Sequence, residues 1–207
     1  MFKTLYIIIR LTIIFIIVIV ALILLKKEKI RFGKKEKVLS VVLICALFLF
    51  PFENLFVEFS SPQAAFVYQQ SGKIIKTIYG KESALVIYKQ KDTISYSVHV
   101  KDEDRWKLAS KFNQEVRFIP IENPKGEYVA TLCGTDTSNE YFILLDEINV
   151  KSEISNIKVS DNQNSVFNEF FEMNKLGNYN ITHYSVIYKE DEEYALLIEG
   201  EEYDIDL

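Results

Sequence analysis

The chain is poor in the residues that build catalytic and metal centres. It has two histidines, two cysteines, seven glycines and four prolines among 207 residues. No HxH or HExxH pair sets two imidazoles at metal-ligand spacing, and no glycine-rich loop is present to cradle a phosphate. Cys133-Gly134 is not followed by a nucleophile-elbow motif. We therefore expect a non-enzymatic protein with no catalytic residue, no bound cofactor and no metal site.

The two histidines and the acidic stretches are the only candidates for a metal site, and each is a weak one. His99 and His183 lie in predicted strands, where a structural role is favoured over a zinc site completed by one carboxylate. Asp161–Ser165, Glu190–Glu193 and Glu199–Asp206 are rich in oxygen, but they lack the spaced loop that calcium requires. A solvated acidic surface is the favoured interpretation.

The two cysteines are placed too differently to form a disulfide within one chain. Cys45 lies in an apolar run and Cys133 in the acidic C-terminal part. We expect Cys133 to be a buried small hydrophobe, with pairing between two chains as the alternative. A domain without an internal disulfide suits a bacterial source better than a eukaryotic secretory one.

Two apolar runs near the N-terminus are the most conspicuous feature that is present. Leu11–Leu25 holds 13 Leu, Ile, Val or Phe, and Val38–Phe52 is the second run. The first run is worth roughly −4 to −8 kcal/mol on an insertion scale, and extension back to Leu5 gives 21 residues, about the length of a span. Arg10 then lies inside the span, where it either snorkels to the headgroups or pairs inside a helix bundle. The sequence predicts a transmembrane helical hairpin over residues 1–57.

Charge indicates the orientation of this hairpin. The connector Lys26–Lys37 has seven Lys or Arg and two Glu, and short basic loops stay cytoplasmic. We therefore expect a two-span protein of the cell membrane with both termini extracytoplasmic. A cleaved signal peptide is the alternative, but Lys26 and Lys27 follow the run where small residues would be needed.

The charges of the chain are unevenly divided. Residues 1–52 carry a net charge of +7 and residues 53–207 a net charge of −12. An acidic domain is a poor nucleic-acid binder, because neutralisation of phosphates supplies most of that affinity. The expected partners are therefore the lipid bilayer and an envelope protein, with no nucleic acid; the oligomeric state is left open.

Residues 58–207 are predicted to form one extracytoplasmic domain. Ser61 caps a helix that starts at Pro62 and stops at Gly72. Residues 109–124 are expected to be irregular because they contain two prolines, and residues 166–173 to form a short helix because three Phe recur at helical spacing. Predicted strands cover Lys73–Tyr79, Ser83–Tyr88, Thr93–Lys101, Glu127–Cys133, Tyr141–Leu145, Glu153–Val159, Ile181–Tyr188, Tyr194–Ile198 and Tyr203–Ile205.

These elements predict an α+β fold class. It consists of the N-terminal transmembrane hairpin followed by a mainly antiparallel β-sheet domain with one or two short helices. The short connections between strands favour an antiparallel meander.

Two stretches carry a resemblance to other proteins. Asn54–Pro62 with Ala65-Phe66, and Gly80–Tyr88, resemble a group of two-span membrane proteins from low-GC Gram-positive bacteria. The resemblance covers about 35 residues and the hairpin. It implies a bacterial membrane location but no activity, cofactor or site residue.

Three functions are consistent with these features. The leading hypothesis is a membrane-anchored envelope protein that displays a non-catalytic binding or sensing domain. The second is an immunity or accessory subunit of a membrane complex that acts through its hairpin, with Arg10 and Cys45 inside a helix bundle. The third, the least favoured, is an envelope hydrolase with a surface cleft that holds His99 or His183 beside an acid.

Overall fold

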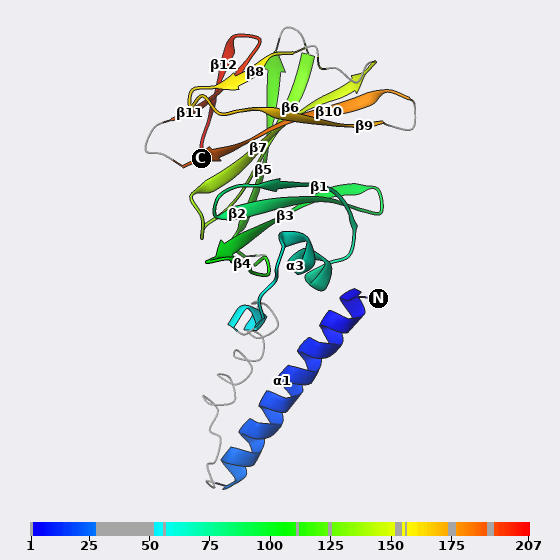
Figure 1. Ribbon diagram of the computed structural model, residues 1–207, viewed down its shortest axis with the longest axis vertical. Helices are drawn as coiled ribbons and strands as arrows, with labels where there is room; N and C mark the ends of the chain where they lie inside the picture. The colour runs from blue at the N-terminus through cyan, green and yellow to red at the C-terminus, as the bar shows by residue number, and fades with distance from the viewer. Residues whose placement is uncertain are drawn as a thin grey trace. The chain divides into compact units, whose positions relative to one another are not determined.

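A computed structural model of the chain describes residues 2–27, 52–55, 57–110, 112–123, 126–151, 155, 157–173, 177–189 and 193–207. The chain divides into two compact units, whose elements are labelled in Figure 1. Unit 1 comprises Met1–Lys76 and Val86–Phe112, and unit 2 comprises Thr77–Leu85 and Asn113–Leu207. The hairpin of the first two strands thus contributes its tip to unit 2.

The N-terminal apolar run forms one helix of unit 1, α1 (Phe2–Lys27). Arg10 lies in its first half with a side chain that is only 11% exposed, and its Nε is 3.6 Å from Oε1 of the buried Glu53. Glu53 belongs to a short 3-10 helix, η1 (Phe52–Leu55). Arg10 thus has a carboxylate partner within its own unit.

In the parts of the chain that the structure describes, no helix combines the length and the hydropathy of a membrane span. The predicted two-span membrane location, with both termini outside, is therefore overturned. Arg10, which the prediction placed inside the first span, is paired with Glu53. The uncharged stretch Leu11–Leu25 alone has 15 residues, which is fewer than the roughly 20 a span needs. The second apolar run and Cys45 lie almost wholly outside the described residues.

The second helix of unit 1, α3 (Pro62–Gln69), begins as predicted. Ser61 is its N-cap and accepts a hydrogen bond from the Ala64 amide, and Pro62 occupies the first turn. Its end differs from the prediction, because the helix stops at Gln69 without a left-handed glycine. The fully buried Phe66 packs on Tyr88 with ring centroids 4.6 Å apart.

A four-stranded sheet has the order β1-β2-β3-β4. Its strands are β1 (Lys73–Tyr79), β2 (Ser83–Gln90), β3 (Thr93–Asp102) and β4 (Arg105–Trp106). The first three agree with the prediction to within two residues. Lys91 and Glu103 adopt positive φ in the two turns that follow β2 and β3, which lets these connections stay short.

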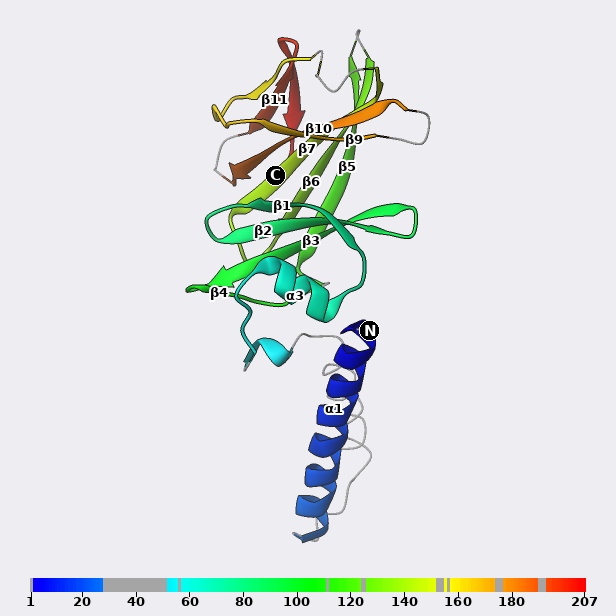
Figure 2. The same cartoon turned by 45° about the vertical axis from the view of Figure 1, so that its right-hand side comes forward.

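A five-stranded antiparallel sheet is the main element of unit 2 and has the order β5-β6-β7-β10-β9 (Figure 2). Its strands are β5 (Gln114–Asn123), β6 (Gly126–Thr135), β7 (Glu140–Val150), β9 (Asn168–Met173) and β10 (Tyr179–Tyr188). The register pairs His183 with both Leu145 on β7 and Glu169 on β9. Strands β5 and β9 are the two edges.

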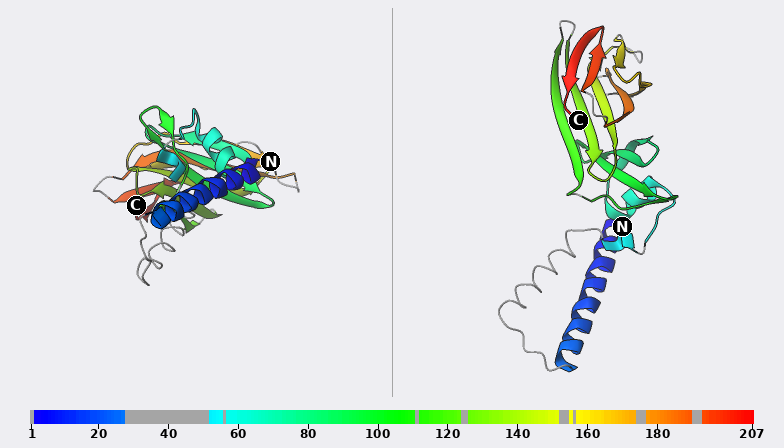
Figure 3. Two further views of the ribbon diagram at one scale, coloured as in Figure 1. Left: turned by 90° about the horizontal axis from the view of Figure 1, so that it is seen from below. Right: turned by 90° about the vertical axis from the view of Figure 1, so that its left-hand side faces the viewer.

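A three-stranded sheet, β12-β11-β8, completes unit 2. Its strands are β8 (Val159–Asp161), β11 (Tyr194–Ile198) and β12 (Glu201–Ile205), and Figure 3 shows β11 and β12 beside the long strands of the larger sheet. One core joins the two sheets, because Leu132, Ile143 and Leu145 cluster with Tyr194 and Leu196. All five side chains are 5% exposed or less.

The predicted strand Glu153–Val159 is wrong, because among its described residues only Val159, the first residue of β8, is in a strand. Two further predicted elements are wrong for physical reasons. The irregular stretch 109–124 contains β5, which tolerates Pro120 because an edge strand leaves one side of its backbone without a ladder. The predicted helix 166–173 is the strand β9, in which Phe170 and Phe171 point to opposite faces and pack on Tyr184 and Tyr179. Three Phe spaced i, i+3, i+4 do not separate a helix from a strand when each ring finds a partner.

The α+β class with a transmembrane hairpin is therefore corrected. The described chain is mainly antiparallel β-sheet, with α1, η1 and α3 as its helical segments. The antiparallel part of the prediction is confirmed by the strand pairing of the five-stranded sheet.

Candidate functional site

The two units carry opposite charge. Unit 2 contains 21 Asp or Glu against seven Lys or Arg, whereas unit 1 contains eight Asp or Glu against 17 Lys or Arg. In unit 2 the hairpin of β11 and β12 turns at Glu199 and Gly200, both with positive φ, and it then exposes Glu201, Glu202 and Asp204. The acidic character of the chain is thus a property of one unit.

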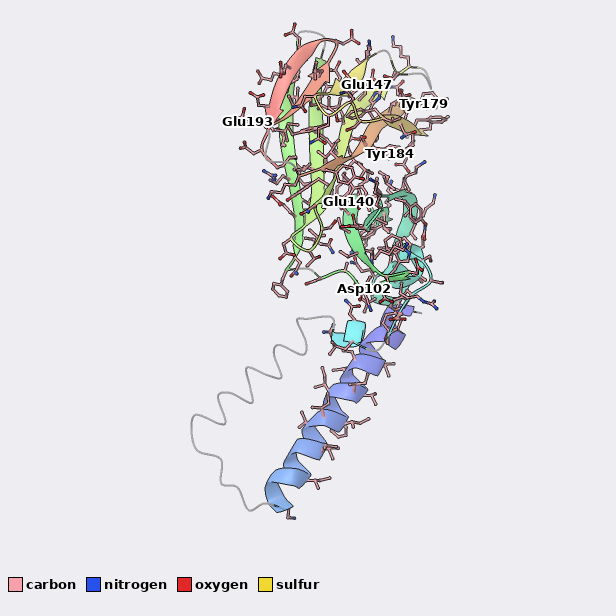
Figure 4. The ribbon with its side chains drawn as sticks, turned by 60° about the vertical axis from the view of Figure 1, so that its left-hand side comes forward. Asp102, Glu140, Glu147, Tyr179, Tyr184 and Glu193 are labelled. Atoms are coloured by element: carbon pink, nitrogen blue, oxygen red, sulfur yellow. The ribbon has the colours of Figure 1, made fainter. Side chains whose placement is uncertain are left out.

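A polar cluster surrounds His183 on β10. Its Nε2 lies 3.0 Å from the Ser155 hydroxyl and 3.7 Å from a Glu147 oxygen, and its Nδ1 lies 3.4 Å from Glu169 Oε1. The imidazole is 3% exposed, whereas the Glu169 side chain is half exposed. The cluster is therefore reached by solvent at Glu169 on β9, and Figure 4 labels Glu147 on β7 and Tyr179 and Tyr184 on β10.

The order Ser155, His183, Glu169 has the connectivity of a nucleophile, a base and an orienting acid. The same hydroxyl is also 2.9 Å from Glu147 Oε2, and its oxygen accepts the Ile157 amide at 3.1 Å. Glu147 competes with His183 for the single hydroxyl proton, and its charge opposes the negative charge that develops in acyl transfer. The cluster is therefore better suited to holding the loop at Ser155 against β7 and β10.

A second carboxylate lies next to this cluster on the opposite face of the sheet. Thr182 donates its hydroxyl to Asp146 Oδ1 at 2.6 Å. Burial raises the pKa of Asp146, while the Thr182 hydrogen bond and His183 act in the opposite direction. Asp146 and Glu147 thus place carboxylates on both faces of one strand end.

Glu140, at the start of β7, is the most completely coordinated carboxylate of unit 2. Its two oxygens accept the backbone amides of Lys81, Glu82 and Ser83 at 2.6, 3.0 and 2.8 Å, and the Ser83 hydroxyl at 2.7 Å. Its residue is 1% exposed. Consecutive amides that converge in this way form an anion-binding nest, and here the anion is a side chain of the same chain.

Gly80 is required beside this nest. A Cβ atom at this position would overlap the carboxylate of Glu140. The side chain of Lys81 extends away from the nest, with its Nζ 5.2 Å from the centre of the Tyr188 ring. The tip of the β1–β2 hairpin is therefore held by contacts from both β7 and β10.

His99 lies in the other unit and has a purely structural environment. It is fully buried on β3, with Nε2 3.2 Å from the Ser97 hydroxyl and Nδ1 3.1 Å from the Lys107 carbonyl. Burial lowers the pKa of His99 to about 4, against a smaller opposing effect of the Lys107 carbonyl. The structure gives His99 and His183 separate sets of partners, and neither set contains the other histidine.

The remaining sequence candidates also have structural partners. Cys133 is fully buried, as expected, and burial raises the pKa of its thiol. Asp161 is buried and accepts the Ser165 amide and the Tyr194 hydroxyl, so its carboxylate is used within a turn and is not part of a solvated surface. Among the residues that the structure describes, no three His, Cys, Asp or Glu side chains are placed to hold a metal ion.

Sequence reasoning missed Ser155, Glu147, Glu169 and Glu140. Ser155 and His183 are 28 residues apart, and Glu140 is 57 residues from Ser83. No local spacing marks either group, because strand pairing brings the members together. Neither a protein-family model, nor a curated protein, nor a solved structure matches this chain.

Proposed function

We propose that this protein is a non-enzymatic binding module and that unit 2 is the part that engages a cationic partner. The observation that carries the proposal is the threefold excess of acidic over basic residues in unit 2, set against the reverse excess in unit 1. A field of one sign raises the rate of encounter with ligands of the other sign. It also disfavours nucleic acids and other polyanions as partners.

The polar groups of unit 2 support a binding role more than a catalytic one. Glu140, Asp161 and Ser155 each use their polar atoms in hydrogen bonds that hold turns and loops in place. Exposed acids such as Glu201 and Glu202 keep their carboxylates available to a partner. Rigid elements that carry an exposed charged surface are suited to recognition.

An oligo-lysine of eight residues tests the proposal on the full chain. We expect saturable binding at about 20 mM salt that weakens steeply toward about 200 mM. Carbodiimide then couples the bound lysines to the carboxylates they touch. Mass spectrometry should find these links in unit 2.

The exposed acids Asp102–Asp104 of unit 1 serve as the internal control. If crosslinks to oligo-lysine form at these residues as often as in unit 2, then unit 2 is not the preferred binding surface. Failure of the oligo-lysine to bind saturably at low salt would remove the proposal as a whole.

A hydrolase is the second candidate, favoured by the approach of Ser155 to His183. In such an enzyme the Ser155 oxygen would attack an ester carbonyl while His183 Nε2 takes the hydroxyl proton, which it would then give to the leaving alcohol. Water would release the acid from Ser155 in a second step. A fluorophosphonate probe should then label the wild-type chain and the Ser160→Ala control but not Ser155→Ala. Equal labelling of all three, or of none, would exclude this candidate.

A further inference from the structure

The two edges of the five-stranded sheet differ in how they are protected. β5 has Pro120 in its interior, and a proline removes one of the amide donors that another strand could use. β9 contains no proline, and among the described residues only β10 pairs with it. An edge strand keeps half of its N–H and C=O groups directed outward. β9 is therefore the edge that is able to accept a further strand.

The two faces of β9 differ in chemistry. Glu169, Phe171 and Met173 share one face, on which Phe171 and Met173 are 49% and 63% exposed, while Glu172 lies on the opposite face. Phe171 makes an edge-to-face contact with Tyr179, with centroids 5.6 Å apart, so its ring is held in place at the edge. On one face, a strand added to β9 would contact Phe171 and Met173. On the other face it would contact Glu172.

Charge selects the kind of strand that suits this edge. A second copy of the chain paired through β9 would bring two Glu169 and two Glu172 side chains together, between two units that each have 14 more acids than bases. Like charges placed opposite each other destabilise a strand pair. A basic segment would be attracted where a second copy would be repelled, because the half-exposed Glu169, which also lies near His183, and the partly exposed Glu172 are both acidic.

We propose that β9 binds an extended peptide segment in which apolar and basic residues alternate. The segment adds a strand to the sheet edge, with its apolar side chains on Phe171 and Met173 and its basic side chains toward Glu172. This inference rests on the proposed function, since it gives the cationic partner of unit 2 a site and a conformation. It also requires the peptide to form backbone hydrogen bonds with β9, which attraction between charges alone does not require.

The test uses the full chain and a fluorescent eight-residue peptide that alternates Val and Lys. We expect the double variant Phe171→Lys/Met173→Lys to bind the peptide at least about tenfold more weakly than wild type. The control is Phe118→Lys/Ile148→Lys, which makes the same charge change at side chains that are 63% and 56% exposed. This control should stay within about twofold of wild type, a difference below 0.5 kcal/mol.

Two further peptides test backbone pairing without any change in the protein. One carries N-methyl groups on its Val residues and the other on its Lys residues, and in each peptide one set of alternate amide donors is blocked. Because only one set faces β9, one of the two peptides should lose about tenfold in affinity and the other should bind nearly normally. Equal affinity of both with the unmethylated peptide would overturn the strand pairing.

The outcomes separate this inference from the proposed function. If both double variants bind the Val–Lys peptide equally well, β9 is not the site, while the cationic partnership of unit 2 stands. If neither this peptide nor oligo-lysine binds at low salt, both proposals fall. A dimer of the wild-type chain that Phe171→Lys/Met173→Lys dissociates would show that a second copy occupies the edge, and this too would overturn the inference.

Discussion

Two buried ionisable residues, Glu140 and His99, are held by hydrogen bonds to nearby polar groups. Glu140 is held by three amides and a hydroxyl of the β1–β2 tip, and His99 by Ser97 and a carbonyl next to β4. Each is costly to bury alone and acceptable once its partners are in place. Both residues therefore report on the integrity of the fold around them.

Glu140→Gln should destabilise the protein by about 3 kcal/mol. The amide side chain keeps one acceptor oxygen and turns a donor toward amides that are themselves donors, so at least one strong hydrogen bond is replaced by repulsion. Urea unfolding followed by far-UV circular dichroism measures the loss. Glu82→Gln is the control, since this exposed carboxyl belongs to the same turn. A loss below about 1 kcal/mol for Glu140→Gln would contradict the geometry of the nest.

His99 should make stability fall as the pH is lowered from about 6.5 to about 4. Its pKa in the folded chain is lowered to about 4, so the unfolded chain binds the proton more readily across this range. The contribution is fully present above pH 6.5 and amounts to about 3 kcal/mol when it is lost at pH 4. The free energy of unfolding, measured across this range for wild type and for His99→Gln, should have a steeper pH dependence in wild type. Parallel curves would contradict the assigned environment.

At the scale of elements, local chemistry specified the beginnings and turns of several segments. Ser61 and Pro62 placed the start of α3, and Asp161 to Ser165 placed a turn, because the responsible hydrogen bonds join residues three or four apart. β9 and β5 could not be placed in this way. Their conformation depends on pairing with β10 and β6, which lie further along the chain.

Ser61→Ala should lower stability by about 1 kcal/mol, because the Ala64 amide at the start of α3 loses its acceptor. Ser60→Ala removes the same hydroxyl from the preceding exposed residue and should change stability by less than about 0.3 kcal/mol. Urea midpoints of the two variants give the comparison. Equal effects would mean that the cap contributes nothing specific to α3.

For the molecule as a whole, the division of charge between the units is the dominant electrostatic property. Unit 2 carries a threefold excess of acids within an antiparallel β-fold. Self-repulsion of this kind weakens the folded state and is screened by salt. The same charge that favours a cationic partner therefore lowers the stability of unit 2 at low ionic strength.

Salt should accordingly stabilise unit 2. We expect the thermal midpoint to rise by a few degrees between about 20 and 200 mM NaCl, and the triple variant Glu201→Gln/Glu202→Gln/Asp204→Asn to reduce this rise. Neutralisation of Asp102–Asp104 in unit 1 is the matched control and should leave the rise intact. Differential scanning calorimetry measures all three proteins. A midpoint that falls with salt in wild type would contradict the role of self-repulsion.

Local sequence patterns were sufficient to predict most strands, the start of α3, the burial of Cys133 and the acidity of the C-terminal part. These properties follow from alternation, capping and composition, which act over a few residues or add up residue by residue. Only the tertiary structure decided that β9 is an edge strand, that Arg10 pairs with Glu53 and that Ser155 meets His183. The described part of the chain also contains no helix with the length and hydropathy of a membrane span, contrary to the predicted hairpin. The edge position of β9 and the Arg10–Glu53 and Ser155–His183 contacts all depend on residues distant in the sequence. Strand pairing and packing select these partners, and a local sequence pattern does not distinguish them from other candidates.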